Sequence, residues 1–159
     1  MIVVSDTSPI SALLQVGKAG MLAQIFGNVV VPAAVYDELA VCHDDLPDWV
    51  HRVEVQNLSA VQSLLLHLDR GESEAIVLAG ELGADFLLMD EKAGREIARQ
   101  QGRHAIGILG VALLAKRQGI LGCTMTDLIF DLRKKAGFRI SKELEARVVA
   151  SAGETAGNG

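Results

Sequence analysis

The run Met-Ile-Val-Val-Ser-Asp at residues 1–6 decides the fold, together with its counterpart Phe-Leu-Leu-Met-Asp at residues 86–90. Each run predicts a short strand buried on both faces, and each ends in an aspartate. In an open α/β sheet the carboxyl ends of the strands line the crevice in which ligands bind. Asp6 and Asp90 are therefore expected to meet there, where two carboxylates repel each other unless a proton or a cation lies between them.

Strand-like and helix-like patterns alternate along the chain, which favours a parallel sheet covered by helices on both faces. We predict an α/β fold, a three-layer α/β/α sandwich with a central, mostly parallel sheet. The expected strands cover residues 1–5, 29–31, 86–89 and 104–108, with an edge strand within 49–55. The expected helices cover residues 8–14, 21–26, 33–40, 59–68, 73–82, 92–101, 111–118, 126–135 and 141–150. Residues 1–150 are expected to form one domain and residues 151–159 a disordered tail.

The composition excludes several classes of protein. Half of the residues are hydrophobic but only 4% are aromatic, which argues against a module that stacks bases on aromatic side chains. No apolar run is long enough to cross a bilayer, and the N-terminus lacks the basic region of a signal peptide. The two cysteines form no CxxC pair and suit a reducing compartment. We expect a cytoplasmic protein with no membrane partner.

The net charge of −5 conceals an uneven distribution. Residues 1–90 carry thirteen acids against three bases, whereas residues 91–147 carry twelve bases against six acids. An acidic cluster beside a basic half would suit a metal-dependent enzyme that acts on a polyanion, because acids hold cations and bases attract phosphates. The alternative is ordinary surface charge that happens to be segregated.

Other acids stand at positions with geometric meaning. Glu38 lies about a turn and a half into the helix that begins after Pro32. Glu72 and Glu74 stand at the start of a predicted helix, where the macrodipole favours negative charge even without a metal ion. Taken singly, each of these acids has a structural explanation, and the case for a metal site depends on the whole set.

Four short motifs resemble, in the same order, those of PIN-domain nucleases. They are Val-Val-Ser-Asp-Thr-Ser-Pro-Ile at residues 3–10, Val-Pro-Ala-Ala-Val-Tyr-Asp-Glu-Leu at 31–39, Glu-Ala-Ile-Val-Leu-Ala at 74–79 and Leu-Leu-Met-Asp at 87–90. The stretches Asp-Glu-Lys-Ala-Gly-Arg at 90–95 and Gly-Ile-Leu-Gly-Val at 107–111 resemble a prokaryotic PIN-like branch related to VapC-type toxins.

This resemblance implies a metal-dependent ribonuclease that uses Mg²⁺ or Mn²⁺ to hydrolyse phosphodiester bonds in single-stranded RNA. It assigns Asp6, Glu38, Glu74 and Asp90 as both the catalytic and the metal-binding acids. It further implies the toxin of a toxin–antitoxin pair, with a small antitoxin protein as partner and a homodimeric state. The sequence departs from the pattern at Ile108, where that branch often has Thr, and at the third acid. That acid is Glu rather than the more frequent Asp, and Glu72 is an alternative to Glu74.

Residues around the acids are assigned supporting roles. Thr7 and Ser8 would hydrogen-bond the Asp6 carboxylate, although capping of the following helix, by Ser8 in particular, explains them equally well. Lys92 and Arg95 share one helix face, and Arg95 is the best candidate to bind a substrate phosphate because its fork matches phosphate geometry. The alternative for this face is simple solvation.

Two other functions are compatible with such a chain. A catalytically weak PIN-like protein could retain the fold and act by binding a partner. Another phosphoryl-transfer enzyme on an α/β scaffold is a further alternative, but a haloacid-dehalogenase-like phosphatase needs Asp-x-Asp after its first strand, and this chain has Asp-Thr-Ser at residues 6–8.

Overall fold

The computed structural model describes residues 1–154, so residues 155–159 of the expected tail lie outside the described part of the chain. The strands are β1 (Val3–Ser5), β2 (Val29–Pro32), β3 (Val50–Val53), β4 (Phe86–Leu88) and β5 (Ala105–Ile106). The helices are α1 (Thr7–Gln15), α2 (Gly20–Phe26), α3 (Ala33–Cys42), α4 (Leu58–Leu64), α5 (Arg70–Leu82), α6 (Lys92–Gln100), α7 (Ile108–Arg117), α8 (Met125–Ala136) and α9 (Lys142–Ser151).

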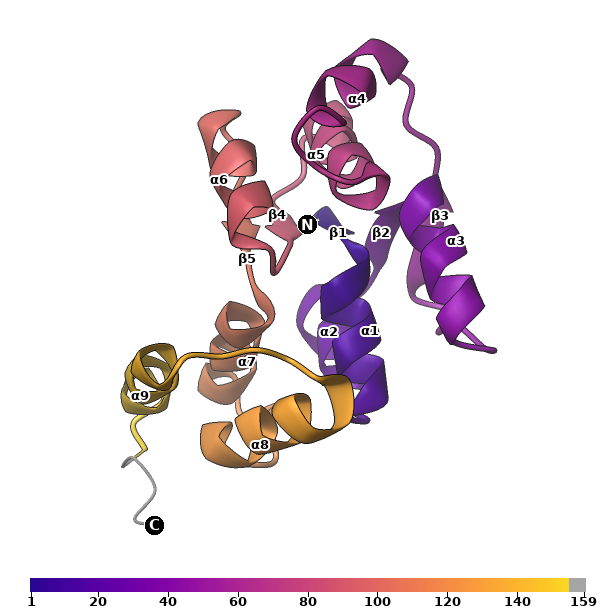
Figure 1. The fold of residues 1–159 in the computed structure, drawn as a ribbon. Coiled ribbons are helices and arrows are strands. Elements are labelled where there is room, and N and C mark those ends of the chain that lie inside the picture. The colour runs from indigo at the N-terminus through magenta and orange to yellow at the C-terminus, as the bar shows by residue number, and fades with distance from the viewer. Residues whose placement is uncertain (155–159) are drawn as a thin grey trace.

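All paired strands are parallel, and their order in the sheet is β3-β2-β1-β4-β5. The chain places β2 and β3 on one side of β1 and then crosses to the other side for β4 and β5. Helices α1, α2, α7 and α8 cover one face of the sheet, and α4, α5 and α6 cover the other (Figure 1). The predicted three-layer α/β/α sandwich is thus confirmed, and its topological switch point lies between β1 and β4.

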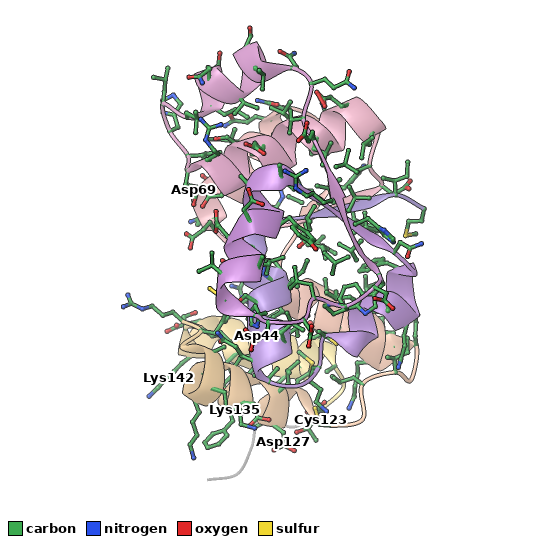
Figure 2. All side chains as sticks on the ribbon, turned by 90° about the vertical axis from the view of Figure 1, so that its right-hand side faces the viewer. Asp44, Asp69, Cys123, Asp127, Lys135 and Lys142 are labelled. Carbon is green, nitrogen blue, oxygen red and sulfur yellow. The ribbon has the colours of Figure 1, made fainter. Side chains whose placement is uncertain are left out.

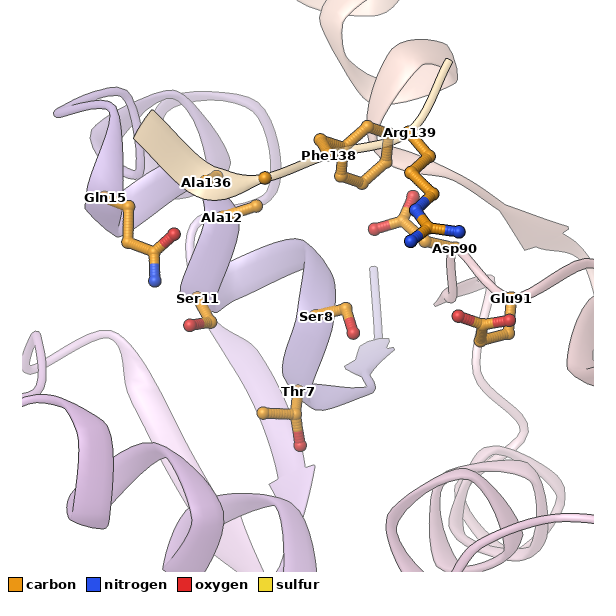
Figure 3. Close-up of a pocket in the computed structure, with 11 residues that line it drawn as sticks. Thr7, Ser8, Ser11, Ala12, Gln15, Asp90, Glu91, Ala136, Phe138 and Arg139 are labelled. Atoms are coloured by element: carbon orange, nitrogen blue, oxygen red, sulfur yellow. The ribbon is translucent and has the colours of Figure 1, made fainter. Parts of the chain in front are cut away.

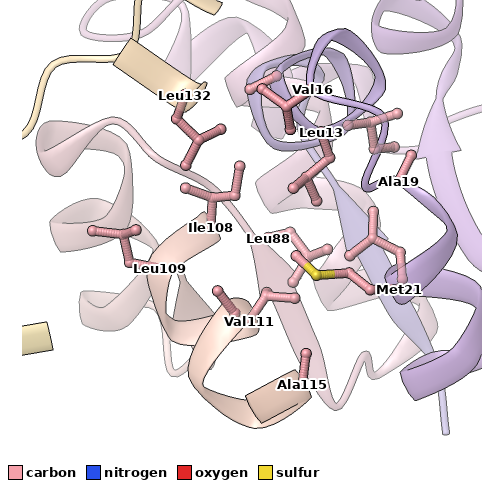
Figure 4. Close-up of a cluster of buried hydrophobic side chains, with 14 of the residues drawn as sticks. Leu13, Val16, Ala19, Met21, Leu88, Ile108, Leu109, Val111, Ala115 and Leu132 are labelled. Carbon is pink, nitrogen blue, oxygen red and sulfur yellow. The ribbon is translucent and has the colours of Figure 1, made fainter. Parts of the chain in front are cut away.

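Neighbouring residues of one strand enter different hydrophobic clusters, because successive side chains point to opposite faces of a sheet. Val3 and Leu88 belong to the cluster formed with α1, α2, α7 and α8, part of which Figure 4 shows. Val4 and Leu87 belong to the cluster on the other face. Each fully buried aliphatic side chain stabilises the fold by roughly 1.5–3 kcal/mol. The two clusters therefore fix β1 and β4, and with them the residues that follow these strands.

Several helix starts differ from the prediction. Helix α7 begins at Ile108 rather than at residue 111, so the strand expected over residues 104–108 is limited to Ala105–Ile106. Helix α1 begins at Thr7 with Asp6 as its N-cap residue, so Ser8 is not the cap. Helix α5 begins at Arg70 rather than near Ser73, because the Asp69 carboxylate accepts a hydrogen bond from the Glu72 backbone N–H at 2.8 Å. That bond satisfies one of the free amides of the first turn, so the helix starts earlier than its apolar spacing indicates.

The C-terminal helices α8 and α9 form one end of the molecule, where Lys135 and Lys142 lie exposed (Figure 2). Beyond α9, the Glu154 carboxylate accepts the backbone N–H of Met125 at 3.0 Å and pairs with Lys116 Nζ at 2.9 Å. These contacts tie the chain as far as residue 154 to α7 and α8. Within residues 1–154, none of the helices has the length and apolarity needed to cross a membrane.

Candidate metal and active site

Asp6 and Asp90 follow the neighbouring strands β1 and β4 at the switch point. The backbone N–H of Asp6 donates to Leu88 O at 2.9 Å, which extends the β1–β4 pairing by one residue. Asp90 stands two residues beyond Leu88. Both carboxylates therefore emerge at the carboxyl edge of the sheet, where open α/β folds bind their ligands.

Asp6 is a buried acid without a cationic partner. Its side chain is 5% exposed, makes no ion pair with any residue of 1–154, and forms no capping bond to α1 although it occupies the N-cap position. Burial raises the pKa of Asp6 to about 7, and the nearby carboxylates act in the same direction against the lowering effect of the Thr7 N–H. Those carboxylates belong to Asp69, Glu38 and Asp90. A cation bound among these carboxylates would offset their mutual repulsion.

Asp90 is held in place by one of its two carboxylate oxygens. Oδ1 accepts the backbone N–H of Ile108 at 2.7 Å, at the start of α7, while Oδ2 is buried and has no hydrogen-bond partner within the described residues. Burial raises the pKa of Asp90 to about 6, even though the Ile108 N–H and the Arg95 guanidinium lower it. One oxygen is thus fixed by the protein, and the other is available to a ligand.

Glu38 approaches Asp6 over the backbone of Gly71. A Cβ on Gly71 would lie 3.0 Å from Glu38 Oε1 and 3.3 Å from Asp6 Oδ1. Residue 71 is buried in the first turn of α5, so a side chain there would press against two carboxylates that come from different elements. Glu38 itself is exposed on α3 and contributes to the raised pKa of Asp6.

Glu72 joins this group. Burial, together with the carboxylates of Asp69 and Asp6, raises the pKa of Glu72 to about 7. Its Oε2 also lies 3.7 Å from the position of a Cβ on Gly94, which places Glu72 between α5 and α6. Asp69, the N-cap residue of α5, lies between the helices predicted over residues 59–68 and 73–82 and was not predicted to belong to the site. The signal for it was an acid three residues before Glu72, a capping pattern that moves the start of α5.

Glu74 points to a different neighbour. Its carboxylate accepts the backbone N–H of Ala34 at 3.2 Å and pairs with Arg70 at 3.4 Å. It therefore supplies negative charge to the N-terminus of α3, a stabilising arrangement in its own right. Glu74 is absent from the charges that raise the pKa values of Asp6, Glu72 and Asp90.

The residues predicted to support the acids differ in their contacts. Arg95 donates to Met89 O at 3.3 Å and to Asp90 O, so its guanidinium holds the backbone beneath Asp90. Lys92 is 84% exposed and stands 4.0 Å from Glu96. Thr7 Oγ1 is buried without a partner among the described residues, and Ser8 lines a cavity beside Asp90.

That cavity has a volume of about 690 Å³ and opens between α1 and the turn that joins α8 to α9. Figure 3 shows Thr7, Ser8, Ser11 and Gln15 on the α1 side, with Arg139 on the opposite wall reaching toward the side that carries Asp90 and Glu91. Sequence reasoning missed Arg139. No local pattern distinguishes it from the other basic residues of the C-terminal half.

The donor set suits a hard divalent cation held mainly through water. Mg²⁺ prefers oxygen ligands, keeps several waters and takes one or two carboxylates directly. Asp6 and the free oxygen of Asp90 are such donors, with Glu38 and Glu72 nearby to hold waters. Within residues 1–154, no three acidic, histidine or cysteine side chains converge closely enough to enclose an ion by themselves.

A family model described as a PIN domain matches residues 2–154, which is nearly the whole chain and includes all the acids described above. No curated protein is significantly similar to the chain.

Proposed function

Because the chain belongs to the PIN-domain family, we propose that it is a Mg²⁺- or Mn²⁺-dependent endoribonuclease that hydrolyses phosphodiester bonds in single-stranded RNA. PIN domains are generally nucleases, bind nucleic acid and typically use divalent metal ions. The observation that carries the proposal is the buried Asp6 carboxylate, which has acids around it and no basic partner within residues 1–154.

We assign the metal-binding and catalytic acids as Asp6, Glu38, Glu72 and Asp90. Asp6 and Asp90 would be direct ligands, and Glu38 and Glu72 would orient water. This set replaces Glu74, the acid implied by motif resemblance, because Glu74 is engaged with Ala34 and Arg70.

In the proposed reaction a water adds to the phosphorus, the bond from phosphorus to one ribose oxygen breaks, and that oxygen takes up a proton. A bound divalent ion lowers the pKa of water and neutralises charge on phosphate oxygens. The chain orients the acids for this task. The Ile108 N–H holds Asp90 Oδ1, and Arg95 holds the backbone at residues 89 and 90. The absence of a side chain at Gly71 allows the carboxylates of Asp6 and Glu38 to approach the same point.

The resemblance to VapC-type toxins extends the proposal. The chain would be the toxin of a toxin–antitoxin pair, a cytoplasmic homodimer whose residues 1–150 form the PIN domain and whose activity a small antitoxin protein restrains. Tight association with such a partner together with no uptake of metal would instead support a catalytically weak binding protein.

Titration calorimetry with Mn²⁺ tests the metal site. The native chain should bind Mn²⁺ at pH 8, Asp6→Asn should not, and Asp48→Asn should bind as the native chain does. Asp48 is an exposed acid just before β3, at the opposite edge of the sheet, and is the matched control. Cleavage of labelled single-stranded RNA in Mn²⁺ should follow the same order. Equal binding by all three proteins would remove Asp6 from the site.

A further inference from the structure

The acid cluster alone would repel the substrate, since a nucleic acid strand is a polyanion. A cation on the protein must therefore lie close enough to hold a neighbouring phosphate. Arg95, the residue predicted for this task, is occupied by the carbonyl groups of residues 89 and 90. Lys92 projects into solvent. The cavity beside Asp90 offers a different cation.

Arg139 is that cation. It is exposed, lines the same cavity as Asp90 and Glu91, and forms no ion pair within 4.0 Å with any residue of 1–154. Its guanidinium presents several N–H donors in a fixed plane, which matches two phosphate oxygens.

The turn that carries Arg139 is fixed from both sides. Gly137 ends α8 with φ 63°, and the Phe138 N–H donates to Leu132 O at 3.0 Å. Arg133 donates to Ile140 O at 2.7 Å and, at the same distance, pairs with Glu145 of α9. The Phe138 ring packs against the hydrophobic cluster beneath. Little conformational freedom of this backbone is left to lose on binding.

The facing wall is polar. Ser8, Ser11 and Gln15 are spaced three and four residues apart on α1, so they share one helix face along the cavity (Figure 3). The Ser11 hydroxyl is held by His43 Nε2 at 3.0 Å. Hydroxyl and amide groups in a row contact phosphate and ribose oxygens without reading the base sequence. The volume of about 690 Å³ lies within the range of roughly 300–1,000 Å³ typical of ligand pockets.

We propose that this cavity binds the RNA strand next to the scissile bond, with Arg139 holding the phosphate adjacent to the one that is cleaved. The assignment rests on the proposed nuclease function, whose substrate path it defines. From Arg139 the strand would leave over the exposed Lys135 and Lys142 (Figure 2).

Fluorescence anisotropy with a labelled single-stranded RNA decamer in EDTA tests this path, because metal-dependent cleavage cannot consume the probe. Arg139→Gln should weaken binding roughly tenfold and flatten the plot of log K against log salt by about 0.7, the loss of one phosphate contact. Arg139→Lys should lose part of the affinity, since it keeps the charge without the fork. The matched control is Arg117→Gln, another exposed arginine, which lies at the end of α7 and is absent from the cavity wall.

Equal weakening by Arg139→Gln and Arg117→Gln, or no weakening by either, would overturn the inference, as would a native chain that does not bind the decamer. A parallel cleavage assay of the native chain in Mn²⁺ separates this result from the fate of the proposed function. If the native chain cleaves RNA but Arg139→Gln binds the decamer as the native chain does, only the proposed RNA path is refuted. If RNA binding depends on Arg139 but the native chain cleaves no RNA in Mn²⁺, only the proposed nuclease activity is refuted.

Discussion

The backbone N–H of Ile108 donates to Asp90 Oδ1 at 2.7 Å and leaves Asp90 Oδ2 buried without a partner among the described residues. One side chain thereby does two tasks. It holds the start of α7 against the end of β4, and it presents an unshared oxygen at the switch point. These tasks require different chemical properties of the side chain, so substitutions at Asp90 can separate them.

Asp90→Asn should keep the bond to Ile108 but lose the charge, whereas Asp90→Ala should lose both. We expect Asp90→Asn to be at least as stable in urea as the native chain at pH 7.5, because it removes a buried charge whose pKa is raised. Asp90→Ala should be less stable than Asp90→Asn by about 1–3 kcal/mol because a buried N–H loses its acceptor. Neither variant should bind Mn²⁺ by calorimetry. Metal binding by Asp90→Asn at native affinity would show that Oδ2 is not a ligand.

Substitutions of Glu72 and Glu74 should likewise distinguish an acid of the metal site from an acid with a structural role. Removing charge at the metal site with Glu72→Gln should reduce RNA cleavage by roughly 10²–10³-fold, the usual loss for one electrostatic group. Glu74→Gln keeps an acceptor for the Ala34 N–H and should change cleavage only a few-fold. Initial rates on single-stranded RNA in saturating Mn²⁺ provide the comparison. The opposite order of the two variants would restore Glu74 to the site.

Whether Glu72 or Glu74 belongs to the site could not be decided from the sequence, because the answer depends on where α5 begins. Two helical residues separated by one position differ by about 200° around the axis, so they face opposite sides. The motif resemblance favoured Glu74. In the structure Asp69 caps the first turn of α5, and Glu72 in that turn lies close enough to Asp6 for the Asp6 carboxylate to raise its pKa.

The location of Asp6 and Asp90 at the carboxyl edge of the sheet, in contrast, was predictable, because parallel strands all end at that edge. The strand order β3-β2-β1-β4-β5 was not predicted, since alternation of strands and helices indicates parallel pairing but not which strands are neighbours. Arg139 was missed for a related reason. It reaches the site only through packing of α8 against α1, which are far apart in the sequence.

The raised pKa of Asp6 predicts a distinctive dependence of stability on pH in the metal-free protein. Its folded pKa of about 7 exceeds the reference value of 3.8, so the folded state holds this proton more tightly than the unfolded state. The free energy of unfolding should therefore fall as pH rises from about 4 to about 7 and stay reduced above that. The raised pKa values of Asp90 and Glu72 act in the same direction.

Asp6→Asn should remove this contribution. In EDTA it should be more stable than the native chain at pH 8, by about 1–3 kcal/mol, and nearly equal to it at pH 4, where Asp6 is protonated. Urea unfolding at both pH values gives the difference directly, and Asp48→Asn is the exposed control. Addition of Mn²⁺ at pH 8 should stabilise only the native chain and the control. An Asp6→Asn effect of the same size at both pH values would contradict the raised pKa.

Gly71→Ala tests the close approach of Glu38 and Asp6 without changing any charge. Its Cβ would lie 3.0 Å from Glu38 Oε1, so the carboxylate must move away. Alanine gains about 1 kcal/mol of helix propensity over glycine, which offsets part of the strain, and the free energy of unfolding should change little. Mn²⁺ affinity and RNA cleavage should both fall by at least roughly tenfold, which corresponds to 1.4 kcal/mol.

The matched control for Gly71→Ala is Gly110→Ala in α7, whose Cβ would meet nothing nearer than Ile106 Cβ at 3.7 Å. It carries the same gain in helix propensity and should bind Mn²⁺ as the native chain does. If Gly71→Ala bound the metal ion as tightly as Gly110→Ala, Glu38 would not need to lie beside Asp6. The metal site would then consist of Asp6, Asp90 and Glu72 alone, and calorimetry on Glu38→Gln should show unchanged affinity.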